Sequence, residues 1–291
     1  MIFSHECSKI LKLSYNQKMN KKISILGCGW LGLPLGKSFV DQNFVVNGST
    51  TNFGKILTLE NAGIKPHIVS ISESRIIGHV NNLLSESSVL IIAIPPKLRG
   101  DAKENFVQKM RNLIPFIEKS VVERVVFISS TSVYSDYEIL ENETQFVDEN
   151  TICEPKTESG KQLLAVEHML MSNRNFQTTI IRFGGLIGVD RNPTNYLAGK
   201  SDVENPNAPV NFIHQKDCIG IINAVIEKNV WNTIFNGVAP NHKTRKNYYS
   251  QKAAELQLKT PIFNESKTSF GKIVSSEKAI SILEYQFVEK I

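Results

Sequence analysis

Long apolar runs are missing from this chain of 291 residues, in which the longest uninterrupted one is Val89–Ile94. A run of that length is far too short to cross a bilayer as a helix. The first residues, Met1–Lys18, also lack the clear apolar core and cleavage site of a secretory signal. We therefore expect no membrane partner.

Cysteine and dense positive charge are scarce as well. The four cysteines are Cys7, Cys28, Cys153 and Cys218; they lie far apart without C-x-x-C spacing and indicate neither a disulfide framework nor a zinc site. We expect no metal and a reducing, cytoplasmic location. The net charge of +5 is spread thinly, without a Lys/Arg block, which argues against a nucleic-acid partner.

What the chain does contain is a regular alternation of short β-rich runs and longer segments with helical periodicity. The expected strands are Ile23–Leu26, Phe44–Val46, His67–Ile71, Val89–Ile94, Arg124–Ile128 and Thr178–Ile181, and the expected helices are Leu31–Val40, Phe53–Asn61, Ala102–Lys119 and Gly160–Met171. This pattern predicts an α/β fold with a Rossmann-type doubly wound parallel sheet and helices on both faces.

The texture of the sequence divides it into three parts. Residues 20–183 read as the nucleotide-binding domain. Residues 184–291 begin with stretches rich in Gly, Pro and Asn and include a helix near Lys216–Lys228, which predicts a small C-terminal α/β substrate lobe with some elements returning to the core. Residues 1–19 form an N-terminal extension, with Met19 directly before the first strand. Met1–Lys18 is interpreted either as a dispensable product of an early start codon or as an ordinary surface arm.

A glycine-rich turn follows the first expected strand. Gly27-x-Gly29-x-x-Gly32 stands between that strand and a helix, the context in which this pattern binds the diphosphate of a dinucleotide. The first glycine permits the turn, the second admits the diphosphate, and the third packs helix on strand. Residues expected at the cofactor are Gly27, Gly29, Trp30, Leu31 and Gly32, followed by Ala93 and Pro95 after the fourth strand.

The end of the second strand indicates which cofactor is bound. NAD-binding proteins place a carboxylate there, whereas this chain has hydroxyl and amide side chains, namely Ser49, Thr50, Thr51 and Asn52, with Lys55 nearby. We therefore predict NADP, with NAD possible. The alternative is that the loop only caps the next helix.

Several short motifs in the second half carry a family resemblance. They are Ser129-Ser130-Thr131-Ser132-Val133-Tyr134, Glu154-Pro155 with Gly160-Lys161, Arg182-Phe183-Gly184-Gly185-Leu186-Ile187-Gly188, and Asn211-Phe212-Ile213-His214-Gln215-Lys216-Asp217. Over residues 20–291 the chain resembles the extended short-chain dehydrogenases/reductases, the group of nucleotide-sugar epimerases and dehydratases. It is similar to an atypical branch, because Leu26 stands where most members have their first glycine.

The resemblance implies catalytic roles, with one departure. It places the family's catalytic Ser on Ser130, the Lys on Lys161 and the Tyr on Thr157. An aliphatic hydroxyl is a poor proton donor compared with a phenol, because the pKa of a phenol can be tuned toward neutrality. Tyr134, or Tyr137 on the loop just after it, could supply the missing acid, although a packing aromatic is the simpler interpretation of Tyr134. Lys161 is expected to hold the nicotinamide ribose, unless it is only a solvated helix lysine.

Four residues are candidates for contact with substrate: Lys97, Arg99, Gly184 and His214. Lys97 and Arg99 suit an anion but also suit a solvated loop, and His214 could simply orient the lobe. The prediction is an NADP(H)-binding oxidoreductase or epimerase that acts on a small, sugar-like molecule, in a chain that could form a homodimer. The alternative is a dinucleotide-binding sensor or scaffold that lacks catalysis.

Overall fold

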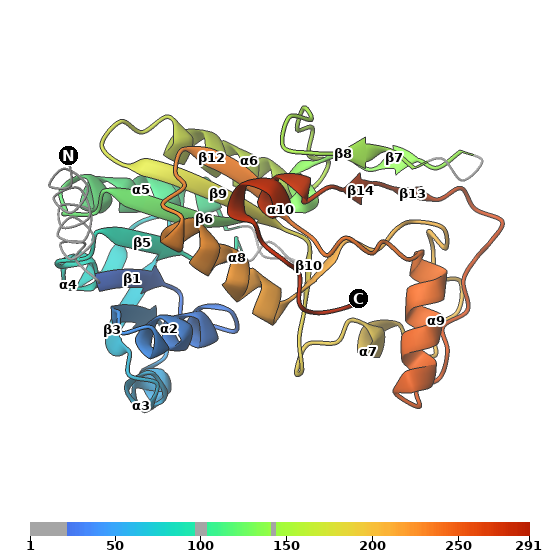
Figure 1. Ribbon diagram of the computed structural model, residues 1–291, viewed down its shortest axis with the longest axis horizontal. Helices are drawn as coiled ribbons and strands as arrows, with labels where there is room; N and C mark the ends of the chain where they lie inside the picture. The colour runs from blue at the N-terminus through green and yellow to red at the C-terminus, as the bar shows by residue number, and fades with distance from the viewer. Residues whose placement is uncertain (1–21, 97–103, 141–143) are drawn as a thin grey trace, which may run out of the picture.

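The computed structural model describes residues 22–96, 104–140 and 144–291 (Figure 1). The expectations for Met1–Lys18, Lys97 and Arg99 therefore fall outside the described residues.

A single large sheet forms the centre of the molecule, with the strand order β12-β9-β6-β5-β1-β2-β3-β4. Its strands are β1 (Lys22–Leu26), β2 (Val45–Thr50), β3 (Lys65–Ile71), β4 (Ile76–Gly78), β5 (Val89–Ile92), β6 (Arg124–Ser130), β9 (Gln177–Phe183) and β12 (Thr233–Gly237). All neighbours pair in parallel except β4, which runs antiparallel to β3. The chain order reverses at β1, between β2 and β5, and such a switch point is where Rossmann-type sheets bind ligands.

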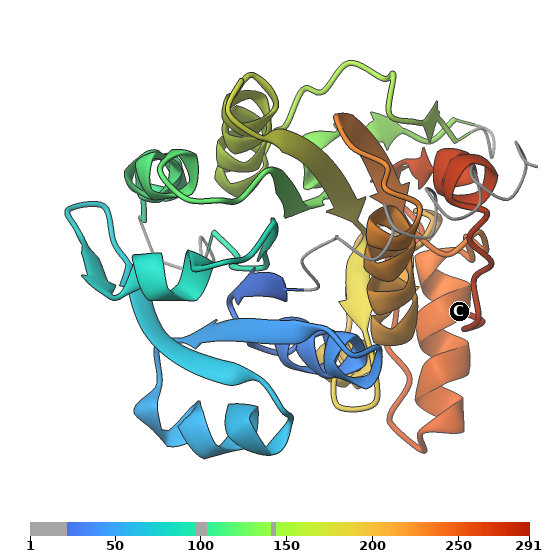
Figure 2. The same ribbon diagram turned by 60° about the vertical axis from the view of Figure 1, so that its left-hand side comes forward.

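Helices cover both faces of this sheet (Figure 2). One face carries α2 (Gly32–Asp41), α3 (Ile56–Asn61), α8 (Gln215–Glu227) and α10 (Glu277–Leu283), and the other carries α4 (Val80–Leu84), α5 (Phe106–Glu118) and α6 (Glu158–Met171). Strand β1 illustrates the division, because Ile23 and Ile25 pack toward α2 whereas Leu26 packs toward α4 and α5. The doubly wound α/β sheet predicted from the sequence is therefore confirmed.

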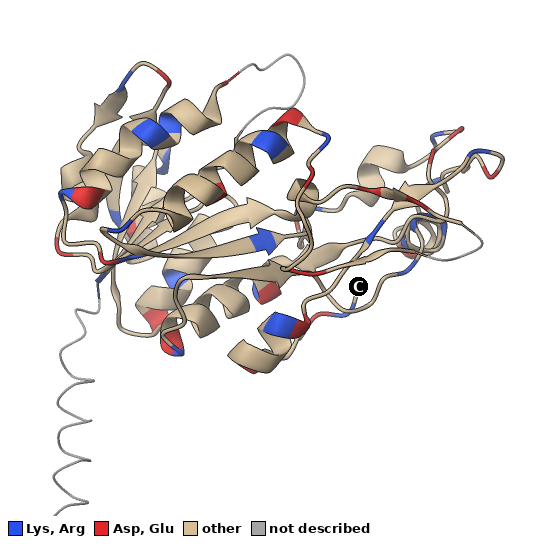
Figure 3. Cartoon of the chain, turned by 90° about the horizontal axis from the view of Figure 1, so that it is seen from above, with Lys and Arg blue, Asp and Glu red and all other residues tan. Residues whose placement is uncertain are grey.

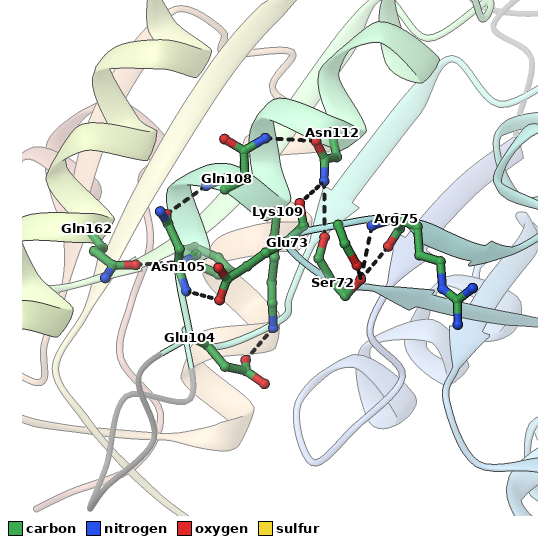
Figure 4. Close-up of polar contacts among 11 residues, drawn as sticks. Ser72, Glu73, Arg75, Glu104, Asn105, Gln108, Lys109, Asn112 and Gln162 are labelled. Carbon is green, nitrogen blue, oxygen red and sulfur yellow. Dashed lines mark hydrogen bonds and ion pairs between the residues drawn. The ribbon is translucent and has the colours of Figure 1, made fainter.

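The start of α5 is held by polar contacts from two other segments (Figure 4). Asn105 caps the helix through the N–H of Gln108, at 2.9 Å, and its own N–H donates to Oε1 of Glu73, at 2.7 Å. The Asn112 side chain donates to the carbonyl oxygen of Glu73, and Oε1 of Gln162 in α6 accepts from the N–H of Phe106. The β3–β4 turn and α6 thus fix where α5 begins.

A smaller lobe extends beyond the carboxyl ends of the strands, and it is seen on the right-hand side of Figure 1. It includes β10 (Gly185–Ile187) paired with β11 (Phe212–His214), α7 (Thr194–Leu197), α9 (Arg245–Glu255), and the short pairs β7 (Tyr137–Glu138) with β13 (Phe270–Gly271) and β8 (Phe146–Val147) with β14 (Ile273–Val274). A separate apolar cluster fills it, with Tyr248, Tyr249 and Phe263 among its members. Strand β12 and helix α10 come from the same C-terminal part of the sequence as the lobe. They nevertheless pack on the main sheet.

Charged residues of both signs are scattered over the helices and loops in the view of Figure 3. Lys and Arg alternate with Asp and Glu on the helices and loops, and they form several exposed ion pairs such as Lys37–Asp41 and Lys246–Glu265. No helix in the described part of the chain is both long and apolar enough to span a membrane.

Gly48, in the middle of β2, yields a prediction about stability. A Cβ at this position would lie 2.5 Å from Sγ of Cys28 and 2.5 Å from Cγ2 of Ile64, both buried. We expect Gly48→Ala to lower the free energy of unfolding by about 1–3 kcal/mol, as overpacking of a core does. Urea unfolding measures this loss. Gly29→Ala is the control, since nothing lies within 4 Å of a Cβ there, and equal stabilities of the two variants would contradict the packing argument.

Candidate functional site

The glycine turn after β1 uses its three glycines in different ways. Gly27 has a φ of +103°, and a Cβ on Gly32 would lie 2.1 Å from the carbonyl oxygen of Gly27. These two residues are therefore required by the turn itself. Gly29, in contrast, is exposed and would meet nothing within 4 Å. The space beside Gly29 is open to a ligand, and a side chain there would fill it.

Ser49 at the end of β2 holds this turn in place. Its hydroxyl accepts from the N–H of Gly27, and its carbonyl oxygen accepts from the N–H of Cys28, both at 2.8 Å. The next amides, those of Trp30 and Leu31, donate to no acceptor among the described residues. Helix α2 also begins without a side-chain cap or an acidic residue in its first turn, in the part of the chain that the structure describes. Free amides and the positive end of a helix dipole suit a phosphate, so the turn fits a dinucleotide.

In the loop after β2, some side chains hold the backbone through hydrogen bonds and others are exposed. Ser49 is 2% exposed and is committed to the turn, and Thr50 accepts from the N–H of Asn52. The Asn52 side chain accepts from the N–H of Gly54 at 2.9 Å and caps the short helix η1 (Phe53–Lys55), as the capping interpretation anticipates. Thr51 and Lys55 remain exposed.

The residues after β5 come close to the turn. The N–H of Ala93 donates to the carbonyl oxygen of Leu26 at 2.9 Å, which keeps the chain beside β1 for one residue beyond the strand. A Cβ on Gly27 would lie 3.2 Å from the carbonyl oxygen of Ala93, so the two strand ends are in contact. Pro95 lies two residues further along, and Pro96 is the last residue described before the undescribed segment.

Ser130, Thr157 and Lys161 are brought to neighbouring elements. The Ser130 hydroxyl accepts from the N–H of Ser132 and caps the short helix η2 (Thr131–Val133), whereas the Thr157 hydroxyl accepts from the N–H of Gly160 and caps α6, both at 3.1 Å. Helix η2 touches the first turn of α6, where a Cβ on Gly160 would lie 2.4 Å from the Ser132 carbonyl oxygen. Lys161 is exposed one turn into α6, and its ammonium has no partner among the described residues.

Tyr134 is not exposed at the strand ends but belongs to a buried polar network. Its hydroxyl donates to Oδ1 of Asn236 at 2.9 Å and accepts from Nη1 of Arg182 at 2.8 Å. The side chain of Arg182 forms an ion pair with Glu167, at 2.6 Å, and Glu167 also accepts from the hydroxyl of Ser129. Burial raises the pKa of Tyr134 to about 12, which the nearby guanidinium only partly offsets. These contacts favour the packing interpretation of Tyr134.

One feature of the sequence indicates this network. Arg182 interrupts the apolar strand β9 between Ile181 and Phe183, and a buried cation requires an anionic partner. The partner, Glu167, lies on the inner face of α6 and is 1% exposed. Asn236 of β12 could not be linked to this pair without knowing that β12 lies next to β9.

The two described candidates for substrate contact both have structural partners. Gly184 allows a close approach, because a Cβ there would lie 2.3 Å from the carbonyl oxygen of Asn211. Nδ1 of His214 accepts from the N–H of Lys216 at 3.2 Å, which caps α8, and it lies 4.0 Å from Oε1 of Glu289. The imidazole of His214 therefore serves as the N-terminal cap of α8.

Comparison with known proteins places this architecture. No family model matches the chain. It is similar to UDP-N-acetylglucosamine 4-epimerase from Bacillus cereus, with a TM-score of 0.73 and 16% identity, over 92% of both chains. It is also similar to UDP-glucuronic acid 4-epimerase from Bacillus cereus in complex with UDP-glucuronic acid and NAD, with a TM-score of 0.74 and 17% identity, over 92% of this chain and 95% of the other. A short-chain dehydrogenase/reductase superfamily protein from Agrobacterium tumefaciens with bound NAD matches with a TM-score of 0.73 and 16% identity, over 92% and 93%.

These likenesses show the fold: the protein has the Rossmann-type fold found in NAD-dependent epimerases and short-chain dehydrogenases/reductases. The chain belongs to the family of Protein YeeZ of Escherichia coli (strain K12). The two share 31% identity over 276 residues, which cover 93% of this chain and 98% of the relative.

The buried network predicts an alkaline limit to stability. Tyr134→Phe leaves Arg182 and Asn236 without the phenol and should lower the free energy of unfolding by about 1–3 kcal/mol at neutral pH. The folded state raises the pKa of Tyr134 from 10.0 to about 12, so the unfolded chain loses the phenolic proton first. The advantage of the wild type should therefore be complete below about pH 10 and fall as the pH rises toward 12.

Urea unfolding at a series of pH values measures this difference. Tyr137→Phe is the matched control, because that tyrosine is 37% exposed. A wild type and a Tyr134→Phe variant that unfold at the same urea concentration at neutral pH would refute the prediction.

Proposed function

We propose that this protein binds a nicotinamide dinucleotide across the carboxyl ends of β1, β5 and β6, and that it prefers NADP(H) to NAD(H). The observation that carries the proposal is the open space at Gly29, flanked by the unpartnered amides of Trp30 and Leu31 at the start of α2. This arrangement stands at the switch point of the sheet, where such a ligand belongs.

The preference for NADP(H) rests on the loop after β2. Among the residues the structure describes there, Ser49 through Lys55, none is a carboxylate that would bind the ribose 2′-OH and repel a 2′-phosphate. The exposed hydroxyl of Thr51 and the exposed ammonium of Lys55 can contact that phosphate instead. Two of the similar structures described above contain NAD, so the proposed preference for NADP(H) rests on this chain's own loop alone.

Further residues have roles toward the bound dinucleotide. The ammonium of Lys161 can donate to the ribose hydroxyls, and the hydroxyl of Ser130, which accepts from Ser132, keeps its own proton for a substrate oxygen. When bound, the dinucleotide supplies hydride transfer, as in an oxidoreductase or an epimerase. The lobe of residues 184–291 would bind the substrate, and the UDP-glucuronic acid in the similar Bacillus cereus structure supports a sugar-like one.

The second candidate function is a dinucleotide-binding sensor or scaffold. Two observations favour it: Thr157 caps α6 where the superfamily resemblance places a tyrosine, and the nearby phenol of Tyr134 is committed to Arg182 and Asn236. Dinucleotide binding requires neither of them to transfer a proton. The two functions therefore share a binding site and differ in turnover.

Gly29→Val tests dinucleotide binding without disturbing the fold. We expect the wild type to bind NADPH more tightly than NADH, and Gly29→Val to lose at least tenfold in affinity for both, because the branched side chain occupies the diphosphate space. Calorimetric titration gives the dissociation constants. In thermal unfolding, the melting temperature of Gly29→Val should equal that of the wild type. A wild type that prefers NADH would refute the NADP assignment, and unchanged binding by Gly29→Val would refute the site.

Lys161→Ala tests the ribose contact and separates the two functions. We expect it to weaken NADPH binding by about 1–3 kcal/mol, as loss of a charged hydrogen bond does. Lys156→Ala is the control, since Lys156 is also exposed but precedes α6. If the wild type turns over sugar-like carbonyl compounds and Lys161→Ala does not, the enzyme function is supported. Tight NADPH binding without turnover on any compound would support the sensor, and equal affinities of the two variants would refute the role of Lys161.

A further inference from the structure

The side chain of Trp30, within the glycine turn, contacts a tight turn in the lobe. Its indole N–H donates to Oδ1 of Asp190 at 2.7 Å, and the guanidinium of Arg191 lies over its ring at 5.0 Å from the centroid. Nε2 of Gln215, at the start of α8, donates to the Trp30 carbonyl oxygen, also at 2.7 Å. Three segments that are distant in sequence therefore meet at one residue of the turn.

The lobe turn is shaped to receive this indole. Gly188 and Arg191 exchange two backbone hydrogen bonds, at 3.0 and 3.1 Å, which closes the turn. A Cβ on Gly188 would lie 2.8 Å from Cζ2 of Trp30, so the ring packs directly on the backbone there. We call Trp30, Gly188, Asp190 and Arg191 the Trp30 clasp.

The positive charge of Arg191 is not neutralised by an ion pair within the clasp. The carboxylate of Asp190 accepts from the indole, and Arg191 forms no ion pair with any carboxylate in the part of the chain that the structure describes. A guanidinium that stacks on a ring keeps its N–H groups in the plane, free for an acceptor at its edge. The guanidinium of Arg191 lies over the ring of Trp30. The backbone amides of Trp30 and of the next residue, Leu31, have no acceptor among the described residues.

We propose that Arg191, held on the indole of Trp30, pairs with the diphosphate of the dinucleotide and thereby closes the lobe turn over the bound cofactor. The proposal rests on the proposed function and names a further residue of that site. It also supplies a charge that the turn lacks, because Gly27 through Gly32 contains neither Lys nor Arg. A planar guanidinium suits a diphosphate, since it can donate two parallel hydrogen bonds.

The first experiment titrates the full chain and its Arg191→Met variant with NADPH, NADH, ADP-ribose and adenosine. ADP-ribose has the diphosphate without the nicotinamide, and adenosine has no phosphate. We expect Arg191→Met to weaken NADPH, NADH and ADP-ribose by the same factor, about tenfold to hundredfold, and to leave adenosine unchanged. Arg174→Met is the control, because Arg174 is exposed and precedes β9, at the amino ends of the parallel strands, whereas the glycine turn lies at their carboxyl ends.

The second experiment tests the clasp itself through Asp190. Asp190→Asn keeps an oxygen that can accept from the indole, whereas Asp190→Ala removes it. We expect Asp190→Ala to weaken dinucleotide binding several-fold and Asp190→Asn to restore most of it. This pair gives an answer even if Arg191→Met fails to fold.

The outcomes separate this inference from the proposed function. A wild type that binds no dinucleotide would refute both. Wild-type binding that Arg191→Met leaves unchanged would refute only the role of Arg191. A loss confined to NADPH would also overturn the proposal, because it would assign Arg191 to the 2′-phosphate.

Discussion

Close approach of backbone at the end of β1 is the constraint on which the rest of the structure depends. A Cβ on Gly32 would collide with the carbonyl oxygen of Gly27, and Gly27 itself lies against Ala93 at the end of β5. Only glycine permits α2 to begin this near the strand. The helix can then present free amides at the switch point, and two hydrogen bonds that Ser49 accepts, from the N–H groups of Gly27 and Cys28, hold the turn against β2.

A second fixed point lies on the other half of the sheet. The ion pair of Arg182 and Glu167 is buried, and hydrogen bonds from Ser129 and to Tyr134 satisfy both of its members. Such a pair is costly to bury unless its geometry is complete, and we infer that it favours one arrangement of β6, β9 and α6. Asn236 extends the network to β12 and, through the Ser275 carbonyl oxygen, to the segment that follows β14.

The sequence was sufficient for six strands of the central sheet, for its longer helices and for the glycine turn, because these follow from local patterns, whereas β12 of the same sheet was not predicted. Buried strands such as β5 are continuous apolar runs, and Gly27, Gly29 and Gly32 stand at fixed spacing. Short elements such as β4, β7 and α4 were not predicted, since so few residues show no periodicity. The contact of Trp30 with Asp190 was equally hidden, because it joins residues 160 positions apart and depends on how the lobe folds back.

The roles of side chains were harder to predict than their positions, and Thr157 shows why. Its place at the start of α6 follows from the sequence, but a threonine there can cap a helix or face a substrate, and the structure assigns its oxygen to the N–H of Gly160. Dinucleotide binding depends mainly on backbone groups and tolerates such changes nearby. Proton transfer depends on one side chain with a suitable pKa, and an aliphatic hydroxyl does not provide it. Binding can therefore persist in this fold independently of turnover, and a measurement of either one does not substitute for the other.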